Sequence, residues 1–262
     1  MLLRAIQSVL VQNVNGIEIV VVQDLPGATM KAELGSLMQR YPIVYVENPG
    51  PHGAANARNF GVRVASGEYV TFLDDDDIYM PGRLSGMLEL MRTNKYTFVS
   101  SGRFYERDDF SEIENVRGQR FGVVTLAAVI KANDIDIGIL LKRSTFIELG
   151  GFDSSFTNLE DWDFVIRLAE LGNGYKRHRF DYCVNTSTGR SRVSSNDWIG
   201  HEELSEKYQQ KFGRHWQVSM LSRVIRLKPG TRFVDYLKLS IKTRSTIPMV
   251  TWAKKQVAAL VR

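Results

Sequence analysis

The chain has 262 residues, of which 44% are hydrophobic, so its length and composition suit one sizeable α/β domain with a short extension. No apolar run reaches the roughly 18 residues that a membrane-spanning helix needs, and residues 1–5 lack the zones of a signal peptide, so we expect a cytoplasmic protein. A single cysteine, Cys183, excludes an internal disulfide and a thiolate zinc site.

The net charge of +5 is concentrated at the C-terminus. Residues 223–262 carry ten Lys or Arg and one acid, Asp235, whereas residues 1–222 carry 24 bases and 28 acids. Apolar and aromatic side chains interleave with these bases, a mixture that suits an anionic membrane surface. A solvated helical face packed on the domain is the open alternative. No recognition motif accompanies the basic segment, so we expect no nucleic-acid partner.

The predicted elements alternate between helix and strand. In chain order they are a helix over 2–10, a strand over 17–22, a helix over 30–38, a strand over 43–46, a helix over 54–65, a strand over 69–73, a helix starting at Pro81 and a strand over 96–101. Beyond residue 105 we expect helices over 124–131, 161–171 and 197–212, a strand over 137–141, and helix in much of the tail.

This alternation predicts a doubly wound, mostly parallel sheet with helices on both faces, plus a helical, basic C-terminal extension. Ligands of such folds bind beyond the carboxyl ends of the strands, so the site is expected just after Val22 and Leu73. A right-handed crossover needs a strand before its helix, yet the chain starts with the helix. We therefore expect either that the protein begins further upstream or that a different strand fills the central slot.

Four consecutive aspartates, Asp74, Asp75, Asp76 and Asp77, follow the predicted strand over 69–73. Two unit charges about 4 Å apart repel by roughly 1 kcal/mol in water and by about 4 kcal/mol at an effective dielectric constant of about 20. The run therefore favours a bound cation. Carboxylates suit Mg²⁺ or Mn²⁺, which also accept diphosphate oxygens as ligands. An acidic loop or helix cap without a metal is the alternative.

Six segments, taken in order, resemble the family 2 glycosyltransferases of GT-A fold. They are residues 3–12, 17–24, 53–61, 66–77, 150–153 and 160–163. The resemblance implies a metal-dependent, inverting transfer of a sugar from a nucleotide diphosphate donor to an acceptor hydroxyl. It assigns nucleotide-sugar binding to residues 1–105 and the acceptor site and catalytic base to residues 106–222, and it leaves 223–262 as a basic amphipathic tail.

The resemblance also implies roles for the donor-side residues that match the family's motifs. Asp24 matches the acid that hydrogen-bonds the nucleotide base, and Arg58 matches the arginine that contacts the nucleoside. Asp74 and Asp76 match the pair that holds the metal and the donor sugar, with Asp76 the direct ligand of Mn²⁺ or Mg²⁺. Asp75 joins the donor site, and Asp77 is a supporting acid.

Asp161 matches the family's catalytic base and begins a predicted helix, whose N-terminus favours the ionised carboxylate that a base requires. Glu160 and Trp162 are then supporting residues. Without the resemblance, Asp161 would be read as part of a helix cap begun by Asn158. His52, which precedes the Gly53 turn, is a further residue that could approach the donor.

Two departures from the family pattern concern its polar residues. Gln23 stands where many relatives carry another aspartate, and residues 185–197 contain no histidine where some relatives place a further metal ligand. As acceptor we expect a glycan or lipid-linked glycan of bacterial surface polysaccharide synthesis, with the protein peripheral on the inner face of the plasma membrane. The alternatives are an inactive nucleotide-sugar-binding or membrane-associated scaffold protein and a nucleotidyltransferase.

Overall fold

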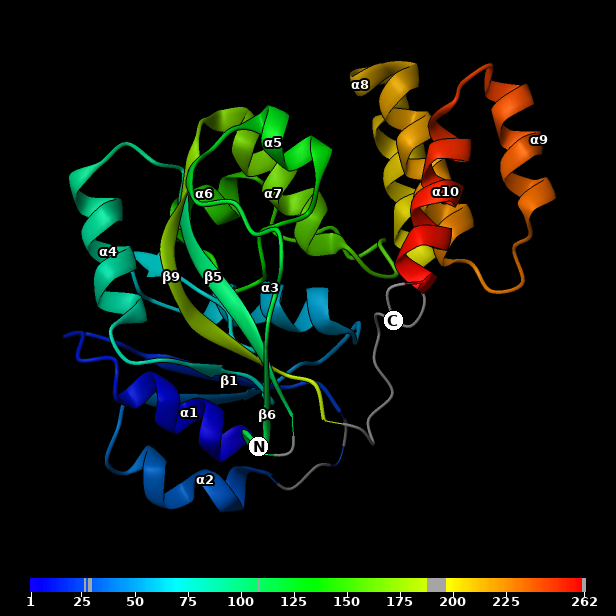
Figure 1. Cartoon of the computed structure of the whole chain (residues 1–262). Coiled ribbons are helices and arrows are strands. Elements are labelled where there is room, and N and C mark those ends of the chain that lie inside the picture. Colours follow the sequence, from blue (N-terminus) through cyan, green and yellow to red (C-terminus); the bar gives the residue numbers. More distant parts are fainter. Residues whose placement is uncertain (26, 28–29, 108, 188–196, 261–262) are drawn as a thin grey trace. The chain divides into compact units, whose positions relative to one another are not determined.

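The computed structural model describes residues 1–25, 27, 30–107, 109–187 and 197–260 (Figure 1). The chain forms two compact units. The first comprises residues 1–154 and 164–190, and the second comprises residues 155–163 and 191–262.

The first unit contains most of the helices and all of the strands in the described part of the chain. Its helices are α1 (Leu2–Leu10), α2 (Met30–Met38), α3 (Ala54–Val64), α4 (Arg83–Thr93), α5 (Leu126–Lys131), α6 (Arg143–Glu148) and the larger part of α7 (Glu160–Leu171). Its strands are β1 (Ile19–Gln23), β2 (Ile43–Glu47), β3 (Tyr69–Val70), β4 (Ile78–Tyr79), β5 (Phe98–Arg107), β6 (Glu112–Asn115), β7 (Gly122–Val124), β8 (Leu140–Lys142) and β9 (Gly174–Asn185).

A small sheet consists of β1 and β2, which run parallel from the pair Ile19 and Ile43 to the pair Gln23 and Glu47. Ile6 of α1 and Leu34 of α2 pack with Ile43 in its core. Among the described residues, no strand other than β2 pairs with β1. No described strand therefore fills the central slot that the sequence left open beside β1.

The larger sheet is mixed and has the strand order β3-β8-β5-β9-β4, with β6 beside β5 and β7 beside β9. β5 and β9 are parallel, and their pairings place β3 in the same direction and β8, β4, β6 and β7 in the opposite one. With helices on both faces, this arrangement confirms the predicted α/β class (Figure 1).

Helices cover the larger sheet from two sides (Figure 1). On one side, Met87 of α4 packs with Val99 of β5 and Leu140 of β8. On the other side, an aromatic cluster joins the chain after β3 to α6 and α7, with neighbouring ring centroids 4.9–5.4 Å apart. Its members are Phe72, Phe146, Phe152 and Phe164. This cluster anchors the turn at residues 150–153 to the sheet.

The second unit is helical over its described residues and contains α8 (Asp197–Leu227), α9 (Phe233–Thr243) and α10 (Ile247–Leu260). Gly213 has φ 74° and ψ 179°, so α8 is two helices on either side of a break, and the first ends where the sequence predicted. In the described part of the chain, no helix combines the length and the apolar character that crossing a membrane requires.

Some predicted boundaries were wrong for local reasons. α4 begins at Arg83 and not at Pro81, because Gly82 has a left-handed φ of 80° and the helix forms only after it. β3 covers Tyr69–Val70 only, since the chain from Thr71 onward leaves the ladder with β8. The strand predicted over 96–101 is β5, which starts at Phe98 and continues to Arg107 because β6 pairs with its second half.

Candidate active site

The four aspartates form a turn between two short strands of the larger sheet. β3 precedes the turn, β4 follows it, and the Asp77 backbone N–H donates to the Asp74 carbonyl at 3.2 Å. Asp75 at the tip is exposed, and Asp74 and Asp76 are half-buried. β3 pairs with β8 and β4 pairs with β9. Both ends of the turn are therefore held by the larger sheet, which fixes the position of the four aspartates.

Asp77 points into the protein. It is 5% exposed, and its carboxylate accepts a hydrogen bond from the Tyr182 hydroxyl at 2.7 Å and another from the Asn185 backbone N–H at 2.9 Å. Burial, followed by the charge of Asp74 and a smaller effect of Asp76, raises the pKa of Asp77 to about 7 despite these hydrogen bonds. Asp77 therefore ties the acidic turn to β9, and the charges of Asp74 and Asp76 both reach it.

Two of the predicted donor-side residues are in direct contact. Nη2 of Arg58, on α3, lies 2.6 Å from Oδ1 of Asp74. The Arg58 guanidinium also lies 5.9 Å from the centre of the Phe152 ring. α3 packs closely on β1, since a Cβ added at Gly61 would lie 3.0 Å from Cγ2 of Val22. The small residues of α3 thus bring Arg58 from the small sheet to the acidic turn of the larger one.

Asp24 follows the last residue of β1, and a ring of donors surrounds its carboxylate. Oδ1 accepts from Nδ2 of Asn48 at 2.7 Å and lies 3.4 Å from Nδ1 of His52, while Oδ2 accepts from the Gly53 backbone N–H at 2.7 Å. Burial opposes ionisation, but these hydrogen bonds outweigh it and lower the pKa of Asp24 below its usual value. The loop between β2 and α3 therefore holds Asp24 as a fixed, ionised acceptor.

The predicted catalytic residues lie at the start of α7, which begins at Glu160. In the second unit, Asp161 is half-buried and its Oδ1 accepts the Trp162 backbone N–H at 2.7 Å. Trp162 is 1% exposed and packs edge-on against His201, with the ring centroids 5.7 Å apart. The side chain of Asn158 has no hydrogen-bond partner in the described part of the chain, so it does not cap this helix.

Asp163, two residues further along α7, has a structural role. Its Oδ1 lies 2.7 Å from Nζ of Lys207 and accepts the Tyr208 hydroxyl at 2.8 Å, and Asp163 is fully buried. Both partners belong to α8, in the same unit. Of the acids near the start of α7, Asp163 therefore holds the helix in place, while Asp161 keeps solvent contact.

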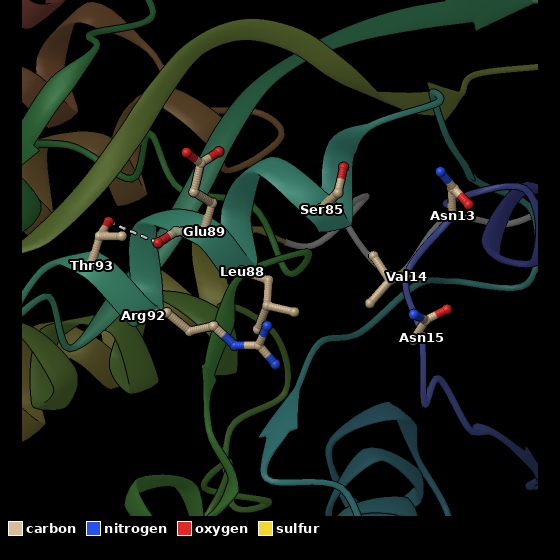
Figure 2. Close-up of a pocket in the computed structure, with 8 residues that line it drawn as sticks. All are labelled: Asn13, Val14, Asn15, Ser85, Leu88, Glu89, Arg92 and Thr93. Atoms are coloured by element: carbon tan, nitrogen blue, oxygen red, sulfur yellow. Dashed lines mark hydrogen bonds between the residues drawn. The ribbon is translucent and has the colours of Figure 1, made fainter.

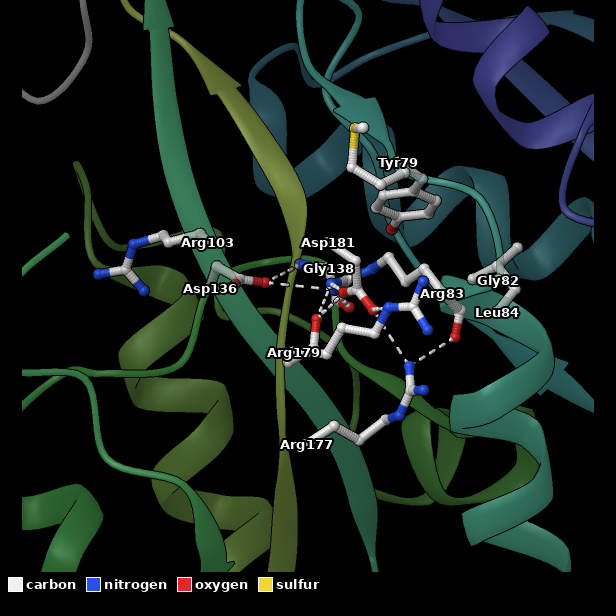
Figure 3. A network of polar contacts seen from close by, with 12 residues as sticks. Tyr79, Gly82, Arg83, Leu84, Arg103, Asp136, Gly138, Arg177, Arg179 and Asp181 are labelled. Carbon is white, nitrogen blue, oxygen red and sulfur yellow. Dashed lines mark hydrogen bonds and ion pairs between the residues drawn. The ribbon is translucent and has the colours of Figure 1, made fainter. Parts of the chain in front are cut away.

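A buried ionic network that the sequence did not predict lies beside Tyr79 (Figure 3). The fully buried Arg83 donates to Asp181 at 2.8 Å and to the Gly138 carbonyl at 2.5 Å. Its guanidinium lies 4.7 Å from the centre of the Tyr79 ring and 5.0 Å from that of Tyr182. Because a buried charge must be paired, this network fixes the tyrosine that holds Asp77.

A cavity of about 430 Å³ lies next to α4 (Figure 2). It is lined by residues 13–15, after α1, and by α4 side chains that include Ser85, Leu88, Glu89 and Arg92. None of the residues that the sequence assigned to donor binding, metal binding or catalysis lines it. The cavity therefore lies outside the predicted site.

No group of three or more His, Cys, Asp or Glu side chains in the described residues is arranged to hold a metal ion by itself. The half-buried Asp74 and Asp76 offer oxygen ligands of the type that Mg²⁺ and Mn²⁺ prefer, and such ions complete their shells with water and phosphate. These two carboxylates therefore fit a metal shared with a diphosphate. The stretch 188–196, within the segment where some relatives place a histidine, lies outside the described residues.

The family described as Glycosyl transferase family 2 matches residues 1–150. A putative colanic acid biosynthesis glycosyl transferase of Escherichia coli, WcaA, is 26% identical over 222 residues, covering 81% of this chain and 78% of that protein. The Escherichia coli enzyme named UDP-Glc:alpha-D-GlcNAc-diphosphoundecaprenol beta-1,3-glucosyltransferase WfaP is 30% identical over 178 residues, covering 65% of each. Of two further curated relatives, the chain spans 66% and 63% of the length.

Solved structures share the fold. A crystal structure of S. aureus TarS in complex with UDP-GlcNAc superimposes with a TM-score of 0.65 at 14% identity, over 86% of this chain and 67% of that one. At this level of identity the likeness concerns the fold alone. It agrees with the GT-A class expected from the sequence.

Proposed function

This chain belongs to glycosyl transferase family 2, and we propose that it transfers a sugar from a nucleotide diphosphate donor to an acceptor hydroxyl, with inversion at the anomeric carbon. The contact between Arg58 and Asp74 is the observation that carries this proposal. It joins α3, the helix after the loop that contacts Asp24, to the acidic turn that follows β3. Two residues that were assigned to donor binding from separate motifs are thus in direct contact.

For donor binding, we assign Asp24 to the nucleotide base. An acceptor that is ionised and held by Asn48 and Gly53 can receive an N–H of a base without rearranging. Arg58 contacts the nucleoside, Asp74 and Asp75 contact the donor, and Asp77 supports their turn through its hydrogen bonds to β9. TarS was crystallised with UDP-GlcNAc and WfaP is named for UDP-Glc, so a UDP-sugar is the first donor to test.

A divalent ion, Mn²⁺ or Mg²⁺, is proposed at Asp76 with Asp74. When bound, it offsets the negative charge that develops on the departing diphosphate. Burial is the main cause of the raised pKa of Asp77, and the charges of Asp74 and, more weakly, Asp76 raise it further. The two carboxylates therefore add negative potential at the turn, which a bound cation would offset.

For the chemical step, we assign the general base to Asp161, with Glu160 and Trp162 as supporting residues. The acceptor oxygen forms a bond to the anomeric carbon while the bond from that carbon to the diphosphate oxygen breaks, and Asp161 takes the proton of the acceptor hydroxyl. Asp161 lies in the first turn of α7, a position where the helix dipole favours a negative charge, and the fully buried Trp162 follows it in the chain.

The proposed acceptor is a glycan or lipid-linked glycan of bacterial surface polysaccharide synthesis. WcaA is named for colanic acid biosynthesis, and the name of WfaP gives a diphosphoundecaprenol-linked sugar as its acceptor. An acceptor of the latter type is anchored in a membrane. We therefore also propose that the chain is peripheral on the inner face of the plasma membrane, bound through the basic tail at residues 223–262.

Donor hydrolysis tests the reaction without knowledge of the acceptor. We expect the purified chain to release UDP from a UDP-sugar when Mn²⁺ is present, and we expect this release to stop when a chelator is added. Asp76→Asn should release UDP about a hundredfold more slowly than the wild type. An inactive binder would show donor affinity without any UDP release. A nucleotidyltransferase would instead form pyrophosphate from a sugar phosphate and a nucleoside triphosphate.

A further inference from the structure

α9 exposes a row of large apolar side chains. Phe233, Leu237 and Ile241 recur every four residues on one side of the helix and are 46%, 40% and 69% exposed, with Val234 beside them at 38%. The opposite side is anchored by Tyr236, which is 1% exposed. Single exposed apolar residues are common on protein surfaces, whereas a continuous row of them on one helix face indicates an interaction site.

Basic side chains lie along this apolar row. Lys238 and Lys242 are exposed and occupy the next row of the same helix, in line with Val234. Asp235 is the acid between residue 223 and the end of the sequence, and its carboxylate accepts the Arg232 backbone N–H at 2.7 Å as part of the helix cap. The exposed face of α9 thus combines an apolar stripe with uniformly positive flanking charge.

An aromatic pair lies at the N-terminal end of this face. Phe233 packs edge-on against Trp252 of α10, with the ring centroids 4.8 Å apart, and α10 lies beside α9 (Figure 1). α10 continues the same composition, since Val250 and Val257 are 49% and 61% exposed and Lys254 is exposed. Aromatic rings next to basic residues are typical of segments that lie at the boundary of lipid headgroups and acyl chains.

We propose that the face of α9 formed by Phe233, Leu237, Ile241, Lys238 and Lys242 docks on an anionic lipid surface. The apolar row would enter the headgroup region while the two lysines contact the lipid charges. A second copy of this chain is a poorer occupant, because pairing two such faces would bring their lysines together. The inference specifies the proposed membrane association and does not depend on the proposed sugar transfer.

The test is co-sedimentation of the full chain with vesicles of phosphatidylcholine alone or of equal parts phosphatidylcholine and phosphatidylglycerol. We expect binding to the anionic vesicles only. Lys238→Gln combined with Lys242→Gln should weaken this binding about thirtyfold, since each base near such a surface contributes about 1 kcal/mol and 1.4 kcal/mol is about tenfold. Leu237→Ser combined with Ile241→Ser should weaken it about tenfold or more.

Ile113→Ser is the matched control, because Ile113 is 61% exposed on β6 of the first unit, and it should bind like the wild type. UDP release from a UDP-sugar, measured without lipid, reports separately on the proposed transferase. Absence of binding to anionic vesicles, or equal binding by the wild type and both double variants, overturns the inference. So does a dimer of the wild type in solution that the Leu237 and Ile241 changes dissociate.

Discussion

At the scale of single residues, the hydrogen bond from the Tyr182 hydroxyl helps to hold the acidic turn in position. The hydroxyl donates to a buried carboxylate on Asp77, and hydrogen bonds to charged groups contribute more than those between neutral groups. At about pH 8, above the pKa of about 7 of Asp77, Tyr182→Phe should therefore lower the free energy of unfolding by about 1.5–3 kcal/mol and raise the KM for the donor more than it lowers kcat. Urea unfolding and steady-state kinetics measure the two effects.

Tyr41→Phe is the control for that experiment, because Tyr41 is 42% exposed and lies between α2 and β2. It should change neither quantity. A Tyr182→Phe protein with wild-type stability and an unchanged KM would show that Asp77 does not depend on this hydrogen bond.

Arg58 provides a second test at the residue scale. Arg58→Lys keeps the positive charge but loses the planar fork that reaches Asp74 and the ring of Phe152. We expect the KM for the donor to rise about tenfold with a smaller change in kcat. Arg63→Lys, on the same helix and exposed, should behave like the wild type. An unchanged KM in Arg58→Lys would remove Arg58 from the donor site.

Residue patterns singled out the acidic turn, Asp24 and Arg58 as candidates, because each belongs to a short local motif next to a strand or a helix. They did not reveal that Asp77 is buried. Its partners Tyr182 and Asn185 lie 105 and 108 residues away, and nothing local in either segment signals the pairing. The same holds for Arg83 and Asp181, 98 residues apart, which form their ion pair only once β9 is in place.

A further prediction concerns how α3 is held, at the scale of secondary-structure elements. Asn59 of α3 donates from Nδ2 to the Phe152 carbonyl and accepts the Phe152 backbone N–H with Oδ1, both at 2.8 Å. Gly151, at φ 72°, lies so close that an added Cβ would be 2.4 Å from Asn59 Oδ1. Asn59→Ala leaves both backbone groups unpaired and should cost about 2 kcal/mol or more in urea unfolding.

Asn56→Ala is the comparison for Asn59→Ala, since Asn56 lies on the same helix and its side chain donates to the His52 carbonyl at 3.2 Å in an exposed position. It should cost well under 1 kcal/mol. Equal losses in the two variants would mean that the link between α3 and the turn at residues 150–153 contributes little to the fold.

Elements with a periodic apolar pattern were predicted close to their true bounds, as α1 and α2 show. β9 was missed because its middle, residues 176–179, reads Lys-Arg-His-Arg, a polar run that hydrophobicity alone does not assign to a sheet. Lys176 is nevertheless fully buried, because Nζ lies 3.0 Å from Oδ1 of Asp134 and donates to the Asp134 carbonyl. A run of charged residues usually predicts an exposed segment, but buried ion pairs of this kind allow such a run to lie inside a sheet.

The two units divide the proposed roles at the scale of the whole molecule. Asp24, Arg58 and the acidic turn belong to the first unit, whereas Asp161 and the proposed lipid-binding face of α9 belong to the second. Donor binding and proton removal should therefore respond to different substitutions. The contact of Trp162 with His201 and those of Asp163 with Lys207 and Tyr208 lie within the second unit, next to Asp161 in the chain.

The most direct measurement combines donor affinity and single-turnover sugar transfer in Asp161→Asn, with Glu170→Gln, exposed on the same helix, as control. A UDP-sugar and a lipid-linked glycan serve as substrates. We predict that Asp161→Asn binds the donor like the wild type and transfers at least about a hundredfold more slowly, because the acceptor hydroxyl keeps its proton. Transfer at the wild-type rate by Asp161→Asn would contradict the account.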